Sequence, residues 1–198
     1  MNDGTDLISA LTPVTAVLDQ LGVRFYVGGS VASSFHGAAR STMDVDIVCE
    51  LVAEKVSAFV SAFGDDFYVS ESAVRAAIQW QSWFNLIHLS TSFKVDVFIS
   101  RGRVFDTSSM NRATLETPGG EPPLKVRIAT AEDSIISKLE WYRKTNETSE
   151  RQWDDVTRLI RLLGSQADLA RLTDMATSVG VDDLLNRLLN ENRDGSAA

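Results

Sequence analysis

The first 129 residues alternate between strand-like and helix-like segments, whereas the residues after Thr130 carry only helical patterns. Runs of β-branched and aromatic residues bounded by glycine or serine predict strands, and apolar residues at intervals of three and four predict helices. We therefore expect an α/β (α+β) fold in which a mixed β-sheet is flanked by helices and followed by a C-terminal helical bundle. The expected boundaries are 1–129 for the core and 130–198 for the helical region that packs on it.

The same patterns place the individual elements. Helices are predicted at 6–21, 30–37, 52–63 and 70–79, and further helices start near residues 131, 150 and 166. Strands are predicted at 23–29, 43–51 and 124–129, and a hairpin at 83–100. The segment 101–123 contains a Pro-Gly-Gly-Glu-Pro-Pro cluster and is predicted to be a loop or a short edge strand, and residues 191–198 a frayed tail.

Charge and cysteine content restrict the partners of the protein. Among 198 residues, 19 Lys and Arg stand against 27 Asp and Glu, which gives a formal net charge of -8. A chain of this charge repels polyanions at long range, so a contact with nucleic acid has to be local. The single Cys49 cannot form an intramolecular disulfide, and no window approaches the ~20 apolar residues of a membrane span. We therefore expect a cytoplasmic protein with no membrane contact and no disulfide-linked partner.

Three carboxylates occur where strand propensity alone would not place them. Asp44 and Asp46 lie two residues apart on the predicted strand 43–51, so both project from the same face of the sheet. Asp96 lies among valine and phenylalanine in the second strand of the predicted hairpin. Neighbouring carboxylates repel each other, and a hard divalent cation such as Mg²⁺ or Mn²⁺ would balance their charge. The alternative is that Asp44 and Asp46 mark a strand end facing water and that Asp96 protects an edge strand.

A glycine pair lies at the junction between the first predicted strand and the next helix. The residues there are Gly28, Gly29 and Ser30. Glycine lets a backbone approach phosphate closely, and free N–H groups at a helix start can donate to its oxygens. The three residues are therefore a candidate phosphate-binding turn, although Gly-Gly-Ser is also common in turns that bind nothing.

These motifs together resemble the nucleotidyltransferase superfamily that includes DNA polymerase beta and the minimal nucleotidyltransferases. Its signature is a strand ending in Gly-Gly or Gly-Ser, an acid-x-acid pair on the next strand and a third acid on a later strand. The matching residues here are Gly28-Gly29-Ser30, Asp44-x-Asp46 and Asp96. The likeness covers about residues 23–100. It implies a nucleotidyltransferase-type sheet and the transfer of a nucleoside monophosphate with release of pyrophosphate.

The resemblance implies a role for each of these residues. Asp44 and Asp46 would hold metal ions that bridge the triphosphate. Asp96 would contact the second metal ion and activate or orient the attacking hydroxyl. The Gly29 amide and Ser30 would hold the outer phosphates.

The helical region resembles toxin-like nucleotidyltransferases of abortive-infection and toxin–antitoxin systems. The likeness lies in the segment TAEDSIISKLEWYRKTNETSERQWDDVTRLI, residues 130–160. It implies that Lys138 lies near the nucleotide and, less directly, Asp154 or Asp155. Lys138 or Arg40 would offset the charge that builds up on the leaving pyrophosphate.

Other conspicuous residues have a structural interpretation. His36 is expected to hydrogen-bond nearby backbone, and His88 is expected to be structural. Trp141, Tyr142 and Trp153 are spaced for helix–helix packing and are expected in the core.

The resemblance favours an enzyme that acts on a macromolecule. It implies Mg²⁺-dependent transfer from a nucleoside triphosphate such as ATP to a hydroxyl of an RNA such as tRNA, or of a protein side chain. One context is a toxin with a cognate antitoxin. The basic runs 101–103, 125–127 and 143–144 either guide an RNA acceptor or are ordinary exposed ends. Two alternatives remain open: a small-molecule nucleotidyltransferase with an acidic acceptor pocket, such as one that adenylylates an aminoglycoside, and a non-catalytic nucleotide sensor or partner-binding module.

Overall fold

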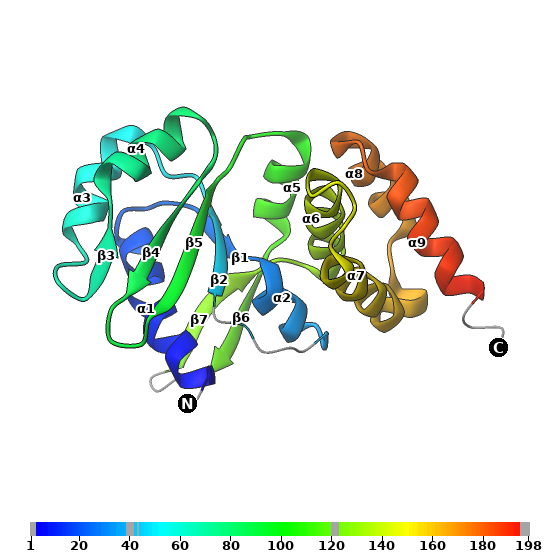
Figure 1. Ribbon diagram of the computed structural model, residues 1–198, viewed down its shortest axis with the longest axis horizontal. Coiled ribbons are helices and arrows are strands. Elements are labelled where there is room, and N and C mark those ends of the chain that lie inside the picture. Colours follow the sequence, from blue (N-terminus) through cyan, green and yellow to red (C-terminus); the bar gives the residue numbers. More distant parts are fainter. Residues whose placement is uncertain (1–2, 39–41, 43, 120–122, 195–198) are drawn as a thin grey trace.

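The computed structural model describes residues 3–38, 42, 44–119 and 123–194, which form one seven-stranded mixed sheet with helices around it (Figure 1). The strands run along the sheet in the order β3-β4-β5-β2-β1-β7-β6. In chain order they are β1 (Phe25–Val27), β2 (Asp44–Cys49), β3 (Phe67–Val69), β4 (Trp83–His88), β5 (Phe93–Ile99), β6 (Thr114–Gly119) and β7 (Leu124–Ile128).

Helices precede, separate and follow the strands. Those before β7 are α1 (Asp3–Gln20), α2 (Gly29–Phe35), the 3₁₀ turn η1 (Ala53–Lys55), α3 (Val56–Ser61), α4 (Glu71–Gln79) and α5 (Val104–Arg112). Those after β7 are α6 (Ala131–Lys144), α7 (Glu150–Leu163), the 3₁₀ turn η2 (Gly164–Gln166), α8 (Leu169–Val179) and α9 (Asp182–Asp194). None of the helices in the described ranges combines the length and the apolar character that a bilayer crossing requires.

One hydrophobic core lies between the sheet and helices α1, α3 and α4. Helix α1 contacts β2, β5 and β7, and α4 contacts β4 and β5. The central strands contribute alternate apolar residues to this core: Val45, Ile47, Val95 and Val97, all fully buried. Because successive strand residues face opposite sides, the residues between them project from the other face of the sheet.

A second hydrophobic cluster joins helices α6 to α9, with Ile135, Leu139, Leu159 and Leu188 fully or almost fully buried within it. Helix α2 contacts both β2 and α6, so it connects the sheet to the helical region, as Figure 1 shows. The division of the chain into two domains at residue 129 stays a prediction.

The predicted fold class is confirmed by the mixed sheet, its flanking helices and the helices that follow it. The predicted hairpin is formed by the antiparallel strands β4 and β5. Two of the predicted helix starts have the capping hydrogen bond that the sequence indicated. Ser70 Oγ accepts the Ala73 N–H at the start of α4, and Thr130 Oγ1 accepts the Asp133 N–H at the start of α6.

The sequence prediction is wrong at four places, one of which is the start of α9 at Asp182, where no helix start was predicted. The segment 101–123 contains helix α5 before the edge strand β6, because Asp106 accepts the Arg103 N–H at 3.1 Å and pairs with its guanidinium at 2.8 Å. Strand β3 was not predicted because it has only three residues, and it is stabilised by antiparallel pairing with β4, which the local sequence does not show. The tail expected to be frayed is helical as far as Asp194, and residues 195–198 lie outside the described part.

Candidate functional site

The three predicted carboxylates lie on one face of the sheet. Strands β2 and β5 are parallel neighbours, and their register places Asp46 directly opposite Asp96. Asp44 is two residues from Asp46, so its side chain projects from the same face. The structure thus brings Asp44, Asp46 and Asp96 together, while their roles in catalysis and metal binding stay predictions.

Burial and mutual repulsion perturb this carboxylate cluster. The pKa of Asp46 is raised to about 6, first by its burial and then by the negative charges of Asp44 and Asp96. The positive charges of Lys138 and Lys94 oppose this shift. Lys94 Nζ lies 2.6 Å from Asp96 Oδ2, whereas Asp96 Oδ1 is buried with no hydrogen-bond partner among the described residues. The cluster therefore has more negative charge than its neighbours balance.

Replacing Asp46 with Asn is expected to stabilise the protein near neutral pH when divalent cations are absent. The pKa of Asp46 in the folded state lies above its ordinary value of 3.8, so its ionisation lowers the free energy of unfolding as pH rises toward 6. The rise of the Asp46 pKa from 3.8 to about 6 corresponds to roughly 3 kcal/mol in the free energy of unfolding once this carboxylate is ionised. Urea unfolding in EDTA should show the variant gaining on the wild type as pH rises from about 4 to about 6, with a constant difference above that range. A stability difference independent of pH would contradict this prediction.

The glycine turn faces the carboxylates. Gly28 N–H donates to the backbone carbonyl of Asp46 at 2.8 Å, which ties the turn to β2. Gly29 begins α2 with φ +56°, and a Cβ built on it would overlap the Asp46 carboxylate. Both the backbone conformation and the available space therefore require glycine at this position. Ser30 follows it and is buried.

Replacing Gly29 with Ala is expected to destabilise the protein by about 2–4 kcal/mol. A left-handed backbone costs a residue with a Cβ about 1–2 kcal/mol, and displacement of the Asp46 side chain adds to that cost. Gly64→Ala is a matched control, because Gly64 has φ +54° and nothing within 4 Å of its added Cβ. Urea unfolding should show a clearly larger loss for Gly29→Ala than for Gly64→Ala. Equal losses would mean that the Asp46 side chain makes room at no cost.

A cavity of about 670 Å³ lies between the carboxylate face and the helical region. Its wall near the sheet includes five of the predicted site residues: Gly28, Gly29, Ser30, Asp44 and Asp46. Asp96 is itself buried and lies next to Asp46 on the neighbouring strand. The cavity therefore brings the phosphate-binding candidates together with Asp44 and Asp46, whereas Asp96 does not line it.

Lys138 lines the same cavity and is almost completely buried. Its Nζ lies 2.7 Å from Oδ2 of Asp155, which is buried as well. Because its charge lowers the pKa of Asp46, Lys138 is close enough to act on the carboxylate cluster. Asp154 is exposed, so Asp155 is the acid that lies beside Lys138. Arg40, the other predicted nucleotide-binding residue, lies outside the described residues.

The residues that were given a structural interpretation divide into two groups. His36 Nε2 donates to the Ala129 carbonyl at 2.7 Å, and Tyr142 is buried with its ring 5.2 Å from that of Trp153. Trp141 is not a core residue as predicted, because it is exposed and lines the cavity.

Comparison with known proteins concerns the fold. No protein-family model and no curated protein sequence matches the chain. A nucleotidyltransferase-like protein from Paracoccidioides brasiliensis superposes with a TM-score of 0.58 at 17% identity, over 100% of this chain and 92% of that one. The solution structure of the antibiotic-resistance factor ANT(2'')-Ia superposes with a TM-score of 0.57 at 11% identity, over 98% of this chain and 99% of that one. The chain has the nucleotidyltransferase fold. The crystal structure of ANT(2'')-Ia in complex with adenylyl-2''-tobramycin gives a TM-score of 0.51 at 12% identity, over 87% of this chain and 96% of that one.

Within this nucleotidyltransferase fold, helix α6 presents to the cavity a row of residues that the sequence analysis did not place at the site. Ser134, Ser137, Trp141 and Lys144 line the cavity together with Lys138. Their intervals of three and four place them on one face of the helix. The Ser134 hydroxyl is buried and has no hydrogen-bond partner within the described ranges. The spacing was visible in the sequence, but which helix face meets the cavity depends on how α6 packs.

The carboxylate cluster suits a hard divalent cation. Asp96 has a buried oxygen without a partner among the described residues, and Asp44 Oδ1 is held by the Thr42 hydroxyl at 2.6 Å. Mg²⁺ prefers oxygen ligands and usually combines one or two carboxylates with water and substrate phosphates. In the part of the chain that the structure describes, no three His, Cys, Asp or Glu side chains, Asp44, Asp46 and Asp96 included, are grouped so that they could hold a metal ion. The metal assignment therefore stays a prediction.

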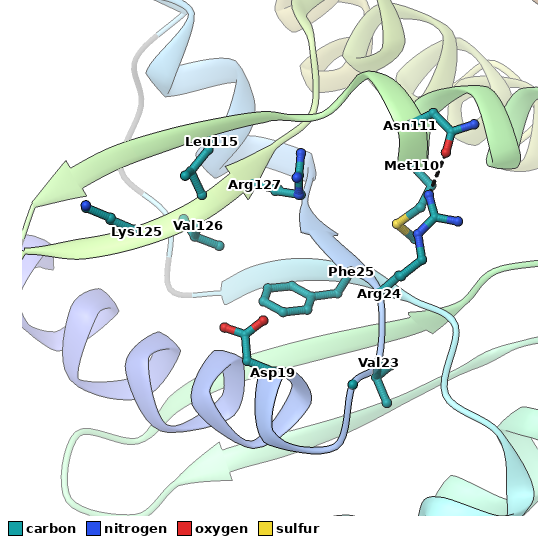
Figure 2. Close-up of a pocket in the computed structure, with 11 residues that line it drawn as sticks. Asp19, Val23, Arg24, Phe25, Met110, Asn111, Leu115, Lys125, Val126 and Arg127 are labelled. Atoms are coloured by element: carbon teal, nitrogen blue, oxygen red, sulfur yellow. Dashed lines mark hydrogen bonds between the residues drawn. The ribbon is translucent and has the colours of Figure 1, made fainter.

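A second cavity, of about 530 Å³, lies at the start of β1 and shares no lining residue with the first. Figure 2 shows Arg24 there, donating to Asn111 Oδ1 at 2.6 Å. Lys125 and Arg127, which belong to one of the basic runs, line this second cavity (Figure 2). By contrast, both arginines of the run 101–103 line the cavity that contains the acids.

Proposed function

We propose that the protein transfers a nucleoside monophosphate from a nucleoside triphosphate to a hydroxyl acceptor and releases pyrophosphate, with Mg²⁺ or Mn²⁺ as cofactor. The observation that carries the proposal is the common face of Asp44, Asp46 and Asp96 beside the glycine turn. The repulsion that Asp44 and Asp96 exert on Asp46 raises its pKa, and a bound cation would offset this charge. Phosphate held at the neighbouring glycine turn would supply further oxygen ligands to that cation. The nucleotidyltransferase fold supports the same activity.

The acceptor oxygen attacks the α-phosphorus, the bond to the oxygen that bridges to the β-phosphate breaks, and pyrophosphate leaves with that oxygen. When bound, the divalent cation offsets the negative charge of the triphosphate. Asp96, which has one oxygen without a partner among the described residues, accepts the proton of the acceptor hydroxyl. The Gly29 N–H and the Ser30 hydroxyl hold the outer phosphates, and Lys138 offsets charge on the leaving pyrophosphate.

The acceptor is proposed to be a macromolecule, with a hydroxyl of an RNA or of a protein as the site of transfer. A toxin with a cognate antitoxin is one setting, which rests on the resemblance of residues 130–160. A second candidate is transfer to a small molecule, because ANT(2'')-Ia has the same fold and has been solved with adenylyl-2''-tobramycin.

The proposal is tested by incubating the purified chain with each α-labelled nucleoside triphosphate, Mg²⁺ and total cellular RNA or protein. Label is expected in one class of acceptor, and only when the divalent cation is present. A non-catalytic sensor would instead show a cation-dependent rise in melting temperature with a triphosphate and no labelled product. No label and no rise with any common triphosphate would refute nucleotide transfer and nucleotide sensing together.

A further inference from the structure

Three aromatic side chains form a surface inside the candidate site, which we call the aromatic shelf: Trp83 on β4, Phe98 on β5 and Trp141 on α6. The ring centroids of Trp83 and Phe98 lie 6.4 Å apart with the planes at 39°, and those of Phe98 and Trp141 lie 5.8 Å apart with the planes at 68°, so the shelf consists of separate ring faces. Trp83 is 50% exposed and Trp141 is 39% exposed, although indole rings are mostly buried in folded proteins. Large rings left exposed within a cavity indicate a ligand with a flat, apolar face.

The shelf lies on one side of the carboxylate cluster. Phe98 is two residues after Asp96 on β5, so both project from the same face, and Trp83 is paired with Phe98 across β4 and β5. In the sheet order β4-β5-β2-β1, the glycine turn at the end of β1 lies on the other side of the acids. Because the proposed function puts the triphosphate at that turn, the acceptor that meets Asp96 approaches over β4 and β5.

Cationic side chains surround the shelf. Arg101, Lys144 and Arg151 line the same cavity. The Lys144 Nζ lies 4.9 Å from the centroid of the Trp141 ring, within the range of a cation–π contact. A ligand that stacks on the shelf would therefore lie close to positive charge, as the phosphates of a nucleic acid would require.

The carboxylates on this side of the cavity are already paired. Apart from Asp44 and Asp46, the acids among the described residues of the wall are Asp106 and Glu140, and each lies 2.8 Å from the Arg103 guanidinium. Glu140 also pairs with Lys144 at 2.9 Å. A polycationic acceptor such as an aminoglycoside needs unpaired carboxylates, and this part of the described wall does not offer them.

We infer that the aromatic shelf binds an unpaired base of a single-stranded nucleic acid that serves as the acceptor, while Arg101 and Arg151 contact its phosphates. The inference rests on the proposed function for the role of this ligand as acceptor. Proteins hold single strands by stacking bases on aromatic rings beside cations, and each stacked base is worth about 1–3 kcal/mol. The local cations also allow a chain with a net charge of -8 to make this contact.

The test measures binding without chemistry. Fluorescence anisotropy follows an end-labelled single-stranded RNA of about ten nucleotides, added to the full chain without triphosphate or divalent cation. We expect Trp83→Ala and Trp141→Ala each to weaken binding about 5- to 150-fold. Trp80→Ala is the matched control, because Trp80 is 73% exposed but does not line the cavity, and it should bind as the wild type does. Arg151→Ala should reduce the slope of log K against log salt by about 0.7.

Each result bears on the inference. Undetectable RNA binding, equal binding by all variants, or an equal loss in Trp80→Ala would overturn it. A loss of ATP affinity in Trp83→Ala and Trp141→Ala with RNA affinity unchanged would also overturn it, because the shelf would then hold the donor base. Tobramycin bound in place of RNA would assign the cavity to a small-molecule acceptor.

A single-stranded DNA of the same sequence distinguishes the two sources of the base. Equal affinity for DNA and RNA indicates contacts to base and phosphate alone, and weaker DNA binding indicates an added contact to the 2′-hydroxyl.

The two proposals fail separately. RNA binding through the shelf, with no label entering any class of acceptor, would refute the proposed transfer and leave the shelf as a nucleic-acid site. Label that enters protein alone, with no RNA binding at the shelf, would refute the shelf inference and leave the transfer reaction.

Discussion

Replacing Asp96 with Asn is expected to lower nucleotidyl transfer about a thousandfold or more while the protein keeps its fold. An amide cannot take the proton of an acceptor hydroxyl, and it lacks the charge that a divalent cation needs. The fold should survive because Asn has nearly the same shape, and because one charge less relieves the repulsion that raises the pKa of Asp46. Initial rates with labelled triphosphate and acceptor, together with a thermal melt, measure both effects.

Asp65→Asn is the matched control for this variant, since Asp65 is an exposed acid remote in sequence from the site motifs. It should transfer label at the wild-type rate. Asp44→Asn, which alters another member of the cluster, should share the loss seen with Asp96→Asn. Transfer by Asp96→Asn within about tenfold of the wild type would exclude Asp96 as the base, since general-base catalysis contributes typically 10²–10⁴-fold.

The common face of the carboxylates could be predicted in part from the sequence. The two-residue period of a strand places Asp44 and Asp46 on one face whatever the surrounding fold. That Asp96 joins them depends on β2 and β5 being parallel neighbours in register, and this pairing is formed by strands separated by more than 40 residues. The sequence indicated this strand pairing only through the resemblance to a known superfamily.

Contacts between distant segments account for what the sequence did not predict. Helix α5 is stabilised at its start by Arg103, whose guanidinium pairs with Glu140, 37 residues away, as well as with Asp106. Trp141 has a spacing that fits helix packing, yet α6 turns this side chain toward Phe98 and the cavity. In both cases local propensity is outweighed by tertiary contacts, which a single sequence does not display.

Replacing Lys138 with Met is expected to destabilise the protein by about 3–5 kcal/mol and to lower nucleotidyl transfer. Lys138 is 5% exposed and Asp155 is 3% exposed, with 2.7 Å between Nζ and Oδ2. Without the lysine, the Asp155 carboxylate loses its cationic partner in a buried position. Asp46 loses one of the two lysines that oppose the rise of its pKa. Urea unfolding of the variant at neutral pH measures the loss of stability.

The double variant Lys138→Met/Asp155→Leu separates stability from catalysis. Apolar replacement of a buried ion pair is often neutral or stabilising, so the free energy of unfolding should return to within about 1 kcal/mol of the wild type. Transfer should stay low, because the cation proposed to face the leaving pyrophosphate is still missing. Recovery of transfer together with stability would make Lys138 a structural residue only. A single Lys138→Met variant as stable as the wild type would instead show that water solvates the Asp155 carboxylate, and that the ion pair is not shielded from solvent.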